Sequence, residues 1–490
     1  MGEHIIVIGS GFSSLAAATT LADQGKRVTI LEKNNQTGGR ARQFIASGFT
    51  FDMGPSWYWM PDVFQTYFEK FGKKVDDYYE LVRLDPSYQV IFQDKEFVDI
   101  PAAYSELRAL FESYEAGSGE QLDKFLTEAA YKYEVGMNDL VHKPSQSLLE
   151  FVQWKVIAGV FKLQLFSSIS KHIRKHFKHK KLVELLEFPV LFLGAKPEET
   201  PALYSLMNYA DIKLGTWYPM GGMHKIVEGM TRLAKEKGVE FILDCEVTKL
   251  EGQQGKITHA ITTKGHFKGT HFISGADYHH TDKKLLAEEF HNYTEQYWDK
   301  RKMAPSSLLF YLGVDKKLSG LRHHNLFFDK SFDQHAVEIY DKPQWPSNPL
   351  FYVCVPSVTD KTVAPEGQEN VFVLIPVAPD LDDNEEVREH YYKKVMDRLE
   401  QLTNQPIREH VIYKRSFAHK DFKEDYYAYK GNAYGLANTL NQTAILKPNL
   451  RNKKLENLFY TGQLTTPGPG VPPSLISGQV VAKEVLKTLP

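Results

Sequence analysis

The sequence has few cysteines and no long apolar run, and both shortages narrow the class of protein. Its 490 residues include only two cysteines, Cys245 and Cys354, which stand far apart and outside any C-x-x-C pattern. We therefore expect neither a disulfide framework nor a metal site, and a reducing compartment is the default. No apolar run reaches the ~18 residues of a membrane-spanning helix. An apolar strand starts within the first five residues, which leaves no room for a signal peptide.

The chain also lacks an excess of charge of either sign. Its net charge is -2 and its pI is about 6.8, which argues against a nucleic-acid partner. At 490 residues the chain exceeds one ordinary domain, so we expect two. Aromatic residues are frequent, at 13%. An enlarged core or a site for a long apolar ligand would each explain them, and composition leaves both open.

What the sequence does contain is a dinucleotide-binding pattern at its start. The apolar run His4–Ile8 breaks at Gly9-Ser10-Gly11 and continues as a small-residue helix. Gly9 permits the tight turn, and Gly11 lets the backbone approach a pyrophosphate at the helix N-terminus. Ser14 replaces the third glycine of the pattern, which affects helix–strand packing but not phosphate binding.

A second short strand and a glycine pair strengthen this interpretation. Val28–Leu31 ends at Glu32, whose carboxylate can accept hydrogen bonds from ribose hydroxyls. Gly38-Gly39-Arg40 follows, which a plain NAD site does not require. The combined pattern favours FAD. Farther along, Trp57-Tyr58-Trp59 is either core packing or a wall beside a flat ring or polyene.

The segment from 146 to 195 combines an apolar stretch with a basic run. Apolar residues crowd positions 148–166, and Lys171–Lys181 then contains no acidic residue. This pattern is typical of a helix that lies on an anionic membrane surface. A buried helix followed by a solvated basic helix is the alternative. We expect peripheral, monotopic association with the cytoplasmic side of a membrane.

The remainder of the chain supplies further strands and a second glycine-rich loop. Leu308–Val314 and Val371–Ile375 are candidate buried strands, and residues 239–273 predict a small meander. Near the end, an apolar strand leads into the Gly/Pro-rich loop Gly462–Pro473 and a helix from Leu475. We expect this loop and the N-terminal turn to face one cavity.

Together these motifs resemble the bacterial-type carotenoid desaturases, also called phytoene desaturases, within the flavin amine oxidase fold group. The segment 48–64 is similar to the versions in flavobacterial phytoene desaturases. The matching stretches are Val7–Leu15, Glu32–Ala41, Phe51–Ser56, Trp217–Gly222 and Gly462–Pro472. The resemblance implies an α/β fold with a Rossmann-like FAD-binding domain, a discontinuous mixed-sheet substrate domain and a helical, membrane-facing subdomain. The FAD-binding domain would comprise residues 1–85, 215–290 and 453–490, and the substrate domain 86–214 and 291–452.

The resemblance further implies FAD bound without a covalent link. Glu32 would hold the adenosine ribose, Val247 the adenine through its backbone, and Gly9 and Gly11 with Arg40 the diphosphate. The riboflavin end would lie along Gly54, Pro55, Ser56, Gly462, Gly470, Val471 and Pro472. Phe12, Ser13, Lys33 and Gly39 complete the expected cofactor-binding set.

The implied activity is FAD-dependent desaturation of phytoene, an apolar C40 isoprenoid, with quinone or oxygen as the electron acceptor. A later-pathway 3,4-desaturase acting on a hydroxylated or already coloured carotenoid is the alternative within the class. Other classes are an amine or protoporphyrinogen oxidase of the same fold and a prenyl carrier without flavin. The sequence does not identify the proton acceptor. Asp211 is a weak candidate, and an ordinary surface carboxylate is the more common explanation of such a residue.

Overall fold

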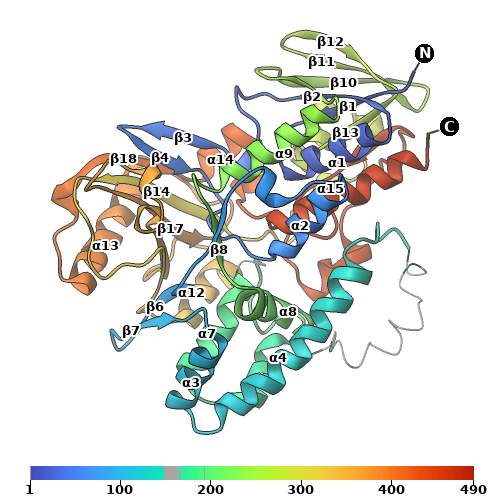
Figure 1. Ribbon diagram of the computed structural model, residues 1–490. Helices are drawn as coiled ribbons and strands as arrows, with labels where there is room; N and C mark the ends of the chain where they lie inside the picture. Colours follow the sequence, from blue (N-terminus) through green and yellow to red (C-terminus); the bar gives the residue numbers. More distant parts are fainter. Residues whose placement is uncertain (1, 148–149, 151–163, 165–166, 192–193, 490) are drawn as a thin grey trace.

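The computed structural model describes residues 2–147, 150, 164, 167–191 and 194–489 (Figure 1). Most of the apolar stretch predicted to contact a membrane, at 148–149, 151–163 and 165–166, therefore lies outside the described residues. The described chain forms two large sheets, of five and seven strands, and three smaller ones, with a helical layer below the large sheets in Figure 1.

The first sheet is the predicted nucleotide-binding sheet. Its strands are parallel in the order β19-β13-β1-β2-β9, and they come from all three predicted FAD-binding segments. They are β1 (His4–Ile8), β2 (Arg27–Leu31), β9 (Glu240–Ile242), β13 (His271–Ser274) and β19 (Leu458–Tyr460). Parallel strands are buried on both faces, which explains why these runs are almost continuously apolar.

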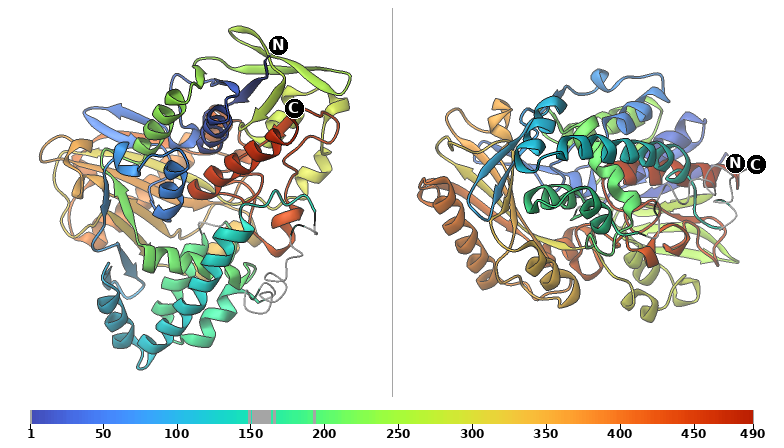
Figure 2. Two further views of the ribbon diagram at one scale, coloured as in Figure 1. Left: turned by 45° about the vertical axis from the view of Figure 1, so that its right-hand side comes forward. Right: turned by 90° about the horizontal axis from the view of Figure 1, so that it is seen from below.

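The longest helices of this first domain are α1 (Phe12–Asp23), α9 (His224–Glu236) and α15 (Val471–Leu486). The two ends of the chain meet where α1 packs against α15 (Figure 2). A Cβ at Gly478 of α15 would lie 2.0 Å from the Ser13 carbonyl oxygen. Glycine is therefore required for this close approach of the two helices.

The meander predicted for residues 239–273 is divided between two sheets. Its first and last strands, β9 and β13, join the parallel sheet instead. The antiparallel meander itself consists of β10 (Val247–Gln253), β11 (Lys256–Thr262) and β12 (Gly265–Lys268). Apolar strands look alike in sequence, and only their pairing partners distinguish a sheet-joining strand from a meander strand.

The second sheet has seven strands in the order β18-β14-β17-β16-β15-β6-β7. Only β15 and β6 pair in parallel, so the sheet is mixed, as predicted. Both candidate buried strands are confirmed, as β14 and β17. The strands are β6 (Tyr88–Phe92), β7 (Phe97–Ile100), β14 (Ser306–Val314), β15 (His324–Phe328), β16 (Phe351–Cys354), β17 (Glu369–Val377) and β18 (Val411–Phe417).

The two faces of this sheet have different neighbours. Leu308 and Phe310 pack with the helix α13 (Glu385–Thr403), whereas Leu309 lines a cavity on the opposite face. This follows from the alternation of side chains along a strand. The helical layer closes the cavity side and contains α3 (Tyr104–Tyr114), α4 (Ser118–Val135), α6 (Ile169–His176), α7 (Lys180–Leu191) and α8 (Leu206–Tyr209).

Shorter elements join these layers. Two small antiparallel sheets pair β3 with β4 and β5 with β8. Their bounds, with those of the remaining helices, are β3 (Gln43–Ala46), β4 (Phe49–Asp52), β5 (Leu81–Arg83), β8 (Trp217–Pro219), α2 (Pro61–Glu69), α10 (Tyr278–His280), α11 (Glu295–Asp299), α12 (Phe332–Ala336) and α14 (His419–Tyr426).

Candidate functional site

One cavity of about 510 Å³ runs from the parallel sheet to the mixed sheet. Both the N-terminal turn and the C-terminal Gly/Pro loop line it, which confirms that the two ends of the chain face the same space. All sixteen predicted cofactor-binding residues are among the lining residues: Gly9, Gly11, Phe12, Ser13, Glu32, Lys33, Gly39, Arg40, Gly54, Pro55, Ser56, Val247, Gly462, Gly470, Val471 and Pro472.

The N-terminal turn has the geometry that a phosphate site requires. Gly9 has a φ of +84°, which favours glycine, and Gly39 lies so close that its Cβ would be 3.4 Å from Gly11 Cα. Gly11 is the N-cap of α1, and no side chain caps it. A Cβ at Gly11 would meet no atom within 4 Å. The first N–H groups of the helix therefore face open space, where an anion can bind them.

Glu32 is buried at the end of β2 and is held rigidly. The N–H and hydroxyl of Ser10 donate to Oε2 at 2.8 and 2.6 Å. The N–H and side-chain amide of Asn34 both donate to Oε1 at 2.9 Å. A carboxylate accepts about four hydrogen bonds. A ribose hydroxyl at Glu32 would thus displace a side-chain donor of Ser10 or Asn34.

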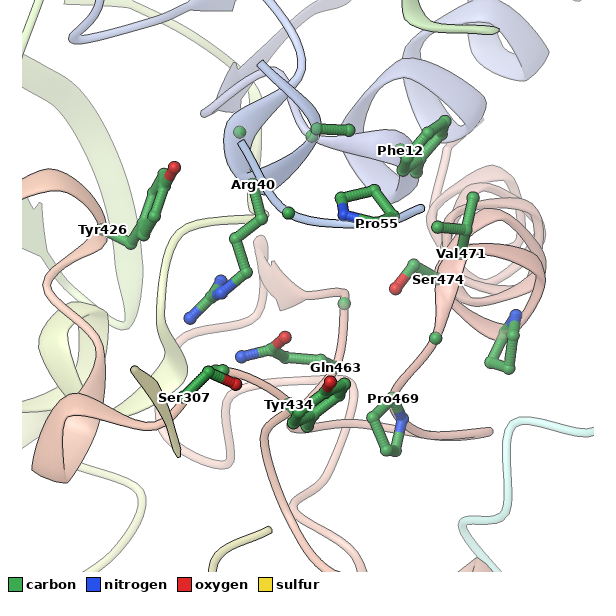
Figure 3. Close-up of a pocket in the computed structure, with 18 of the residues that line it drawn as sticks. Phe12, Arg40, Pro55, Ser307, Tyr426, Tyr434, Gln463, Pro469, Val471 and Ser474 are labelled. Atoms are coloured by element: carbon green, nitrogen blue, oxygen red, sulfur yellow. The ribbon is translucent and has the colours of Figure 1, made fainter. Parts of the chain in front are cut away.

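Arg40 is the charged group that faces the middle of the cavity (Figure 3). Its Nε is buried and has no hydrogen-bond partner in the described part of the chain. Burial lowers the pKa of Arg40, and the nearby Asp277 carboxylate opposes this. The Arg40 Nη2 donates to the Asn432 carbonyl oxygen at 3.4 Å. A buried N–H without a partner is costly, and a phosphate would satisfy Nε with a charge-assisted hydrogen bond.

The loop at Gly54 lies close to this arginine, and the loop at Gly462 lies close to the start of α1. A Cβ at Gly54 would be 2.7 Å from the Arg40 carbonyl oxygen, and one at Gly462 would be 3.3 Å from Ser13 Oγ. The loop after Gly470 leads into α15, where Pro472 and Pro473 lack N–H groups. This second helix N-terminus therefore offers fewer donors than α1 does.

Of the predicted aromatic cluster, only two rings reach the cavity. Trp57 and Trp59 line it, whereas Tyr58 is buried elsewhere, with its hydroxyl 2.9 Å from that of Tyr79. Trp57 also stacks on His324, with ring centroids 4.1 Å apart and an interplanar angle of 9°. Both predicted roles are therefore present: Trp57 and Trp59 form part of the cavity wall, and Tyr58 packs in the core.

Comparison with known proteins identifies the family. The chain matches the family described as flavin containing amine oxidoreductase over residues 12–486. It is 41% identical to a carotenoid 3,4-desaturase of Haloarcula japonica, over 100% of this chain and 99% of that protein. The chain belongs to the flavin-containing amine oxidoreductases, among the carotenoid desaturases.

Two further similarities agree with this assignment. The desaturase is 29% identical to a zeta-carotene-forming phytoene desaturase of Myxococcus xanthus, over 99% of this chain and 94% of that protein. It also shares its fold with a crystal structure of an oxidoreductase from Methanosarcina mazei, with a TM-score of 0.64 and 16% identity. That match covers 98% of this chain and 100% of the other.

FAD is the cofactor of the desaturase, and the residues present fit it. The uncapped start of α1 and the unpaired Nε of Arg40 would both donate to a diphosphate. Val247 and Glu32, which are predicted to hold the adenosine, line the same cavity as the loops at Gly54 and Gly462. The roles of the individual residues remain predictions.

Asp211, the candidate proton acceptor, is not among the cavity-lining residues. It lies behind the wall, where the Tyr88 hydroxyl donates to it at 2.8 Å and the Thr216 hydroxyl at 3.3 Å. Thr216 Oγ1 also accepts from the Trp59 indole N–H at 2.8 Å. Burial raises the pKa of Asp211 to about 7. The geometry therefore supports a role in fixing Trp59 rather than contact with a substrate.

Sequence reasoning missed most of the residues that line the other half of the cavity. These come from the helical layer and the mixed sheet, and include Met137, Phe188, Met207, Ser307, Leu326, Phe328, Tyr340, Leu374 and Tyr434. Nearly all are apolar or aromatic, so in sequence they are indistinguishable from core residues. Tyr434 and Ser307 lie across the cavity from Arg40 and Pro55 (Figure 3).

Proposed function

We propose that this desaturase introduces a double bond at the 3,4 position of a carotenoid. The support is the 41% identity to a carotenoid 3,4-desaturase over the full length of both chains, against 29% to the phytoene desaturase. Phytoene desaturation, which the motifs first indicated, is the second candidate. The two reactions act at different places along a similar hydrocarbon chain.

The lining of the apolar half supports a hydrocarbon substrate over the other reactions known for this fold. Among the described lining residues between 137 and 207 and between 305 and 376, none is Asp, Glu, Lys or Arg. An amine or the carboxylates of a porphyrinogen would lose their hydration there without a charged partner, at a cost of several kcal/mol. A carotenoid carries no charge and buries its surface favourably.

Bound FAD supplies a hydride acceptor, which is needed because no side chain can accept a hydride. The contribution of the chain itself is to hold one C–C bond beside the flavin and to exclude water. Trp57 is suited to this, because the stacked His324 ring prevents it from turning away from the cavity. We propose that a quinone or oxygen reoxidises the flavin.

The expected substrate is oily, and we propose that the desaturase takes it from a membrane surface. None of the helices in the described part of the chain has the length and apolar character to cross a membrane. Lys171, Arg174, Lys175 and Lys178 are exposed on or just after α6. Arg174 pairs with Glu187, whereas Lys171 and Lys175 have no ion pair among the described residues. These cations can bind anionic lipid.

The reaction is tested by pigment analysis. The gene would be expressed in hosts that accumulate either phytoene or an acyclic carotenoid with saturated 3,4 positions. We expect a new conjugated double bond at C3–C4 in the second host and unchanged phytoene in the first. Conversion of phytoene with no product in the second host would support the second candidate instead.

Membrane association is tested separately by flotation with anionic liposomes. We expect the wild type to float with the liposomes. The variant in which Lys171, Arg174, Lys175 and Lys178 are changed to Glu should not float. The matched control changes four exposed lysines of the β10–β12 meander, Lys249, Lys256, Lys264 and Lys268, to Glu. If both variants float equally, or if the wild type does not float, the proposed membrane contact is wrong.

A further inference from the structure

Two histidines and a cysteine meet where β15 begins and β16 ends, and none of them lines the large cavity. His323 directly precedes β15, and His324 and Cys354 are paired across the two strands. One ligand atom of each side chain, an imidazole nitrogen or the thiol sulfur, lies within 4.8 Å of the other two. All three residues are buried, with exposed fractions of 4% or less. The structure therefore brings three potential metal ligands together away from solvent.

Both imidazole rings leave the same nitrogen unpaired. His323 Nδ1 lies 2.8 Å from Thr359 Oγ1, and His324 Nδ1 lies 2.5 Å from the Tyr352 hydroxyl. Nε2 of each ring is buried and has no hydrogen-bond partner in the part of the chain that the structure describes. Buried polar atoms in proteins are almost always paired. Because the two ring centroids are only 4.5 Å apart, one ligand could bind both nitrogens.

The hydrogen bonds at Nδ1 are those expected of histidines that bind a metal through Nε2. When Nδ1–H donates to a hydroxyl oxygen, Nε2 carries no proton and presents a lone pair. Metal-binding histidines usually donate their other ring N–H to a neighbouring acceptor in this way. The Tyr352 hydroxyl is also close to Cys354, so one group can orient both His324 and the thiol.

A single buried water molecule would account for only part of this group. A second cavity, of about 20 Å³, has room for about one water molecule. His323 and Cys354 line this small cavity, but His324 does not. A water molecule there would leave His324 Nε2 unpaired, whereas a metal ion between the three ligand atoms would use both nitrogens. The water could then complete the coordination of the ion as its fourth ligand.

Acidic residues surround the group and suit it to a cation. Asp52 lines the small cavity beside Cys354, and Asp360 is near His323. Two neutral imidazoles and one thiolate would leave a divalent ion with a single positive charge, which the two carboxylates would stabilise. The thiol proton of Cys354 would leave to solvent when the ion binds.

We propose that His323, His324 and Cys354 bind one Zn²⁺ ion. Nitrogen and sulfur ligands favour zinc over magnesium or calcium, which bind oxygen. Donor atoms of a tetrahedral zinc site lie roughly 3.3–3.6 Å apart, so side-chain rotations would have to bring these atoms closer by up to ~1.5 Å. No metal site is expected from the sequence, because its two cysteines are far apart, but this site needs only one of them.

The site would have a structural role at the wall of the large cavity. The His324 ring stacks on Trp57, which lines that cavity. An ion bound to His324 Nε2 would fix the ring, and with it the position of Trp57. The inference does not depend on which carbon–carbon bond the desaturase oxidises, so it can fail or succeed independently of the proposed reaction.

The first experiment is metal analysis of the full-length, FAD-loaded wild type, produced in zinc-supplemented medium and purified without chelators. We expect about one zinc ion per chain. X-ray absorption at the zinc edge should show one sulfur ligand at ~2.3 Å and nitrogen or oxygen ligands at ~2.0–2.1 Å. A wild type without stoichiometric zinc, or zinc without a sulfur ligand, would overturn the inference. Copper bound in place of zinc would also overturn it.

The second experiment measures zinc in variants. Cys354→Ser and His323→Leu should each lose the ion, whereas Cys245→Ser, which changes the other buried cysteine, should keep it. Thr359→Val removes only the hydroxyl beside His323 Nδ1, so zinc affinity should fall by ~10- to 100-fold.

Flavin absorbance and circular dichroism show which of these variants are folded. If folded Cys354→Ser and His323→Leu retain zinc at the wild-type level, the ion is bound elsewhere and the inference is wrong. Equal loss of zinc from Cys245→Ser would lead to the same conclusion. If the ligand variants do not fold, the X-ray absorption of the wild type still decides, because it identifies the ligands without any substitution.

Discussion

The nucleotide-binding half of the cavity is built from residues that are neighbours in the sequence, whereas the apolar half collects residues from distant segments. In the first half, Gly9, Gly11 and Glu32 belong to one strand–turn–helix–strand unit. In the second, Phe188 of α7 and Leu374 of β17 face the same space. The comparison teaches that a backbone-built site is visible in sequence, while a site built from packed side chains is not.

The largest effect is expected for a substitution in the nucleotide-binding half that removes FAD binding but leaves the fold stable. Gly11→Val should abolish FAD binding, because its side chain would occupy the space of the phosphate. The backbone should tolerate valine, since Gly11 has a φ of -68° and a Cβ there meets no atom within 4 Å. We expect the free energy of unfolding of the variant apoprotein to lie within ~0.5 kcal/mol of the wild-type value. Denaturant titration measures this free energy, and flavin absorbance separately reports FAD binding.

Gly478→Val provides the contrasting variant. Its Cβ would overlap the Ser13 carbonyl oxygen at 2.0 Å, so it should lose about 3 kcal/mol of stability and its FAD together. A Gly11→Val protein that is fully loaded with FAD would contradict the placement of the diphosphate.

Arg40 should show a smaller effect on the same half. Arg40→Met removes the buried guanidinium that faces the cavity, and should weaken FAD binding by ~10- to 100-fold. The measurement is a titration of apoprotein with FAD. Arg42→Met is the control, because Arg42 pairs with Asp425 at 2.5 Å and does not line the cavity. If both variants lose FAD affinity equally, the loss comes from the change in overall charge, and the prediction for Arg40 is wrong.

Asp211, behind the apolar half, should affect stability more than catalysis. Its folded pKa of about 7 lies above the unfolded value of ~3.9, so the folded protein binds this proton more tightly. The stability that it contributes is present in acid and is lost as pH rises from ~4 to ~7. Asp211→Asn cannot titrate, so its melting temperature relative to the wild type should rise over that window.

The same variant tests Asp211 as a proton acceptor. Because Asp211 does not line the cavity, desaturation by Asp211→Asn should fall by less than ~10-fold. Loss of a general base costs ~10²- to 10⁴-fold. A fall of that size, with FAD content unchanged, would show that Asp211 takes the proton despite its position.

Prediction from sequence was most successful where function depends on backbone conformation. A turn that needs Gly9 at positive φ and a strand that ends at Glu32 are local features, and both are present. It was less successful for strand partners, because β9 and β13 look like meander strands until their register with the parallel sheet is known. It failed for residues of the apolar half such as Phe188 and Leu374, which carry no motif.

Trp57, Tyr58 and Trp59 show the same limit within three consecutive residues. Their order in the chain says that aromatic rings gather there, but not which of them borders the cavity. Tyr58 forms a backbone bridge to Trp217, and its ring packs on Phe64 at a centroid distance of 4.6 Å. That contact turns Tyr58 into the core and leaves the two tryptophans facing the cavity.

By itself, the sequence determined the cofactor class, the two-sheet architecture and the convergence of both chain ends, because each depends on short runs of glycine and apolar residues. Only the tertiary structure decided which apolar side chains border the cavity and that Asp211 stands behind its wall. The physical reason is that burial and hydrogen-bond pairing are properties of neighbours in space, and most of these neighbours are far apart along the chain.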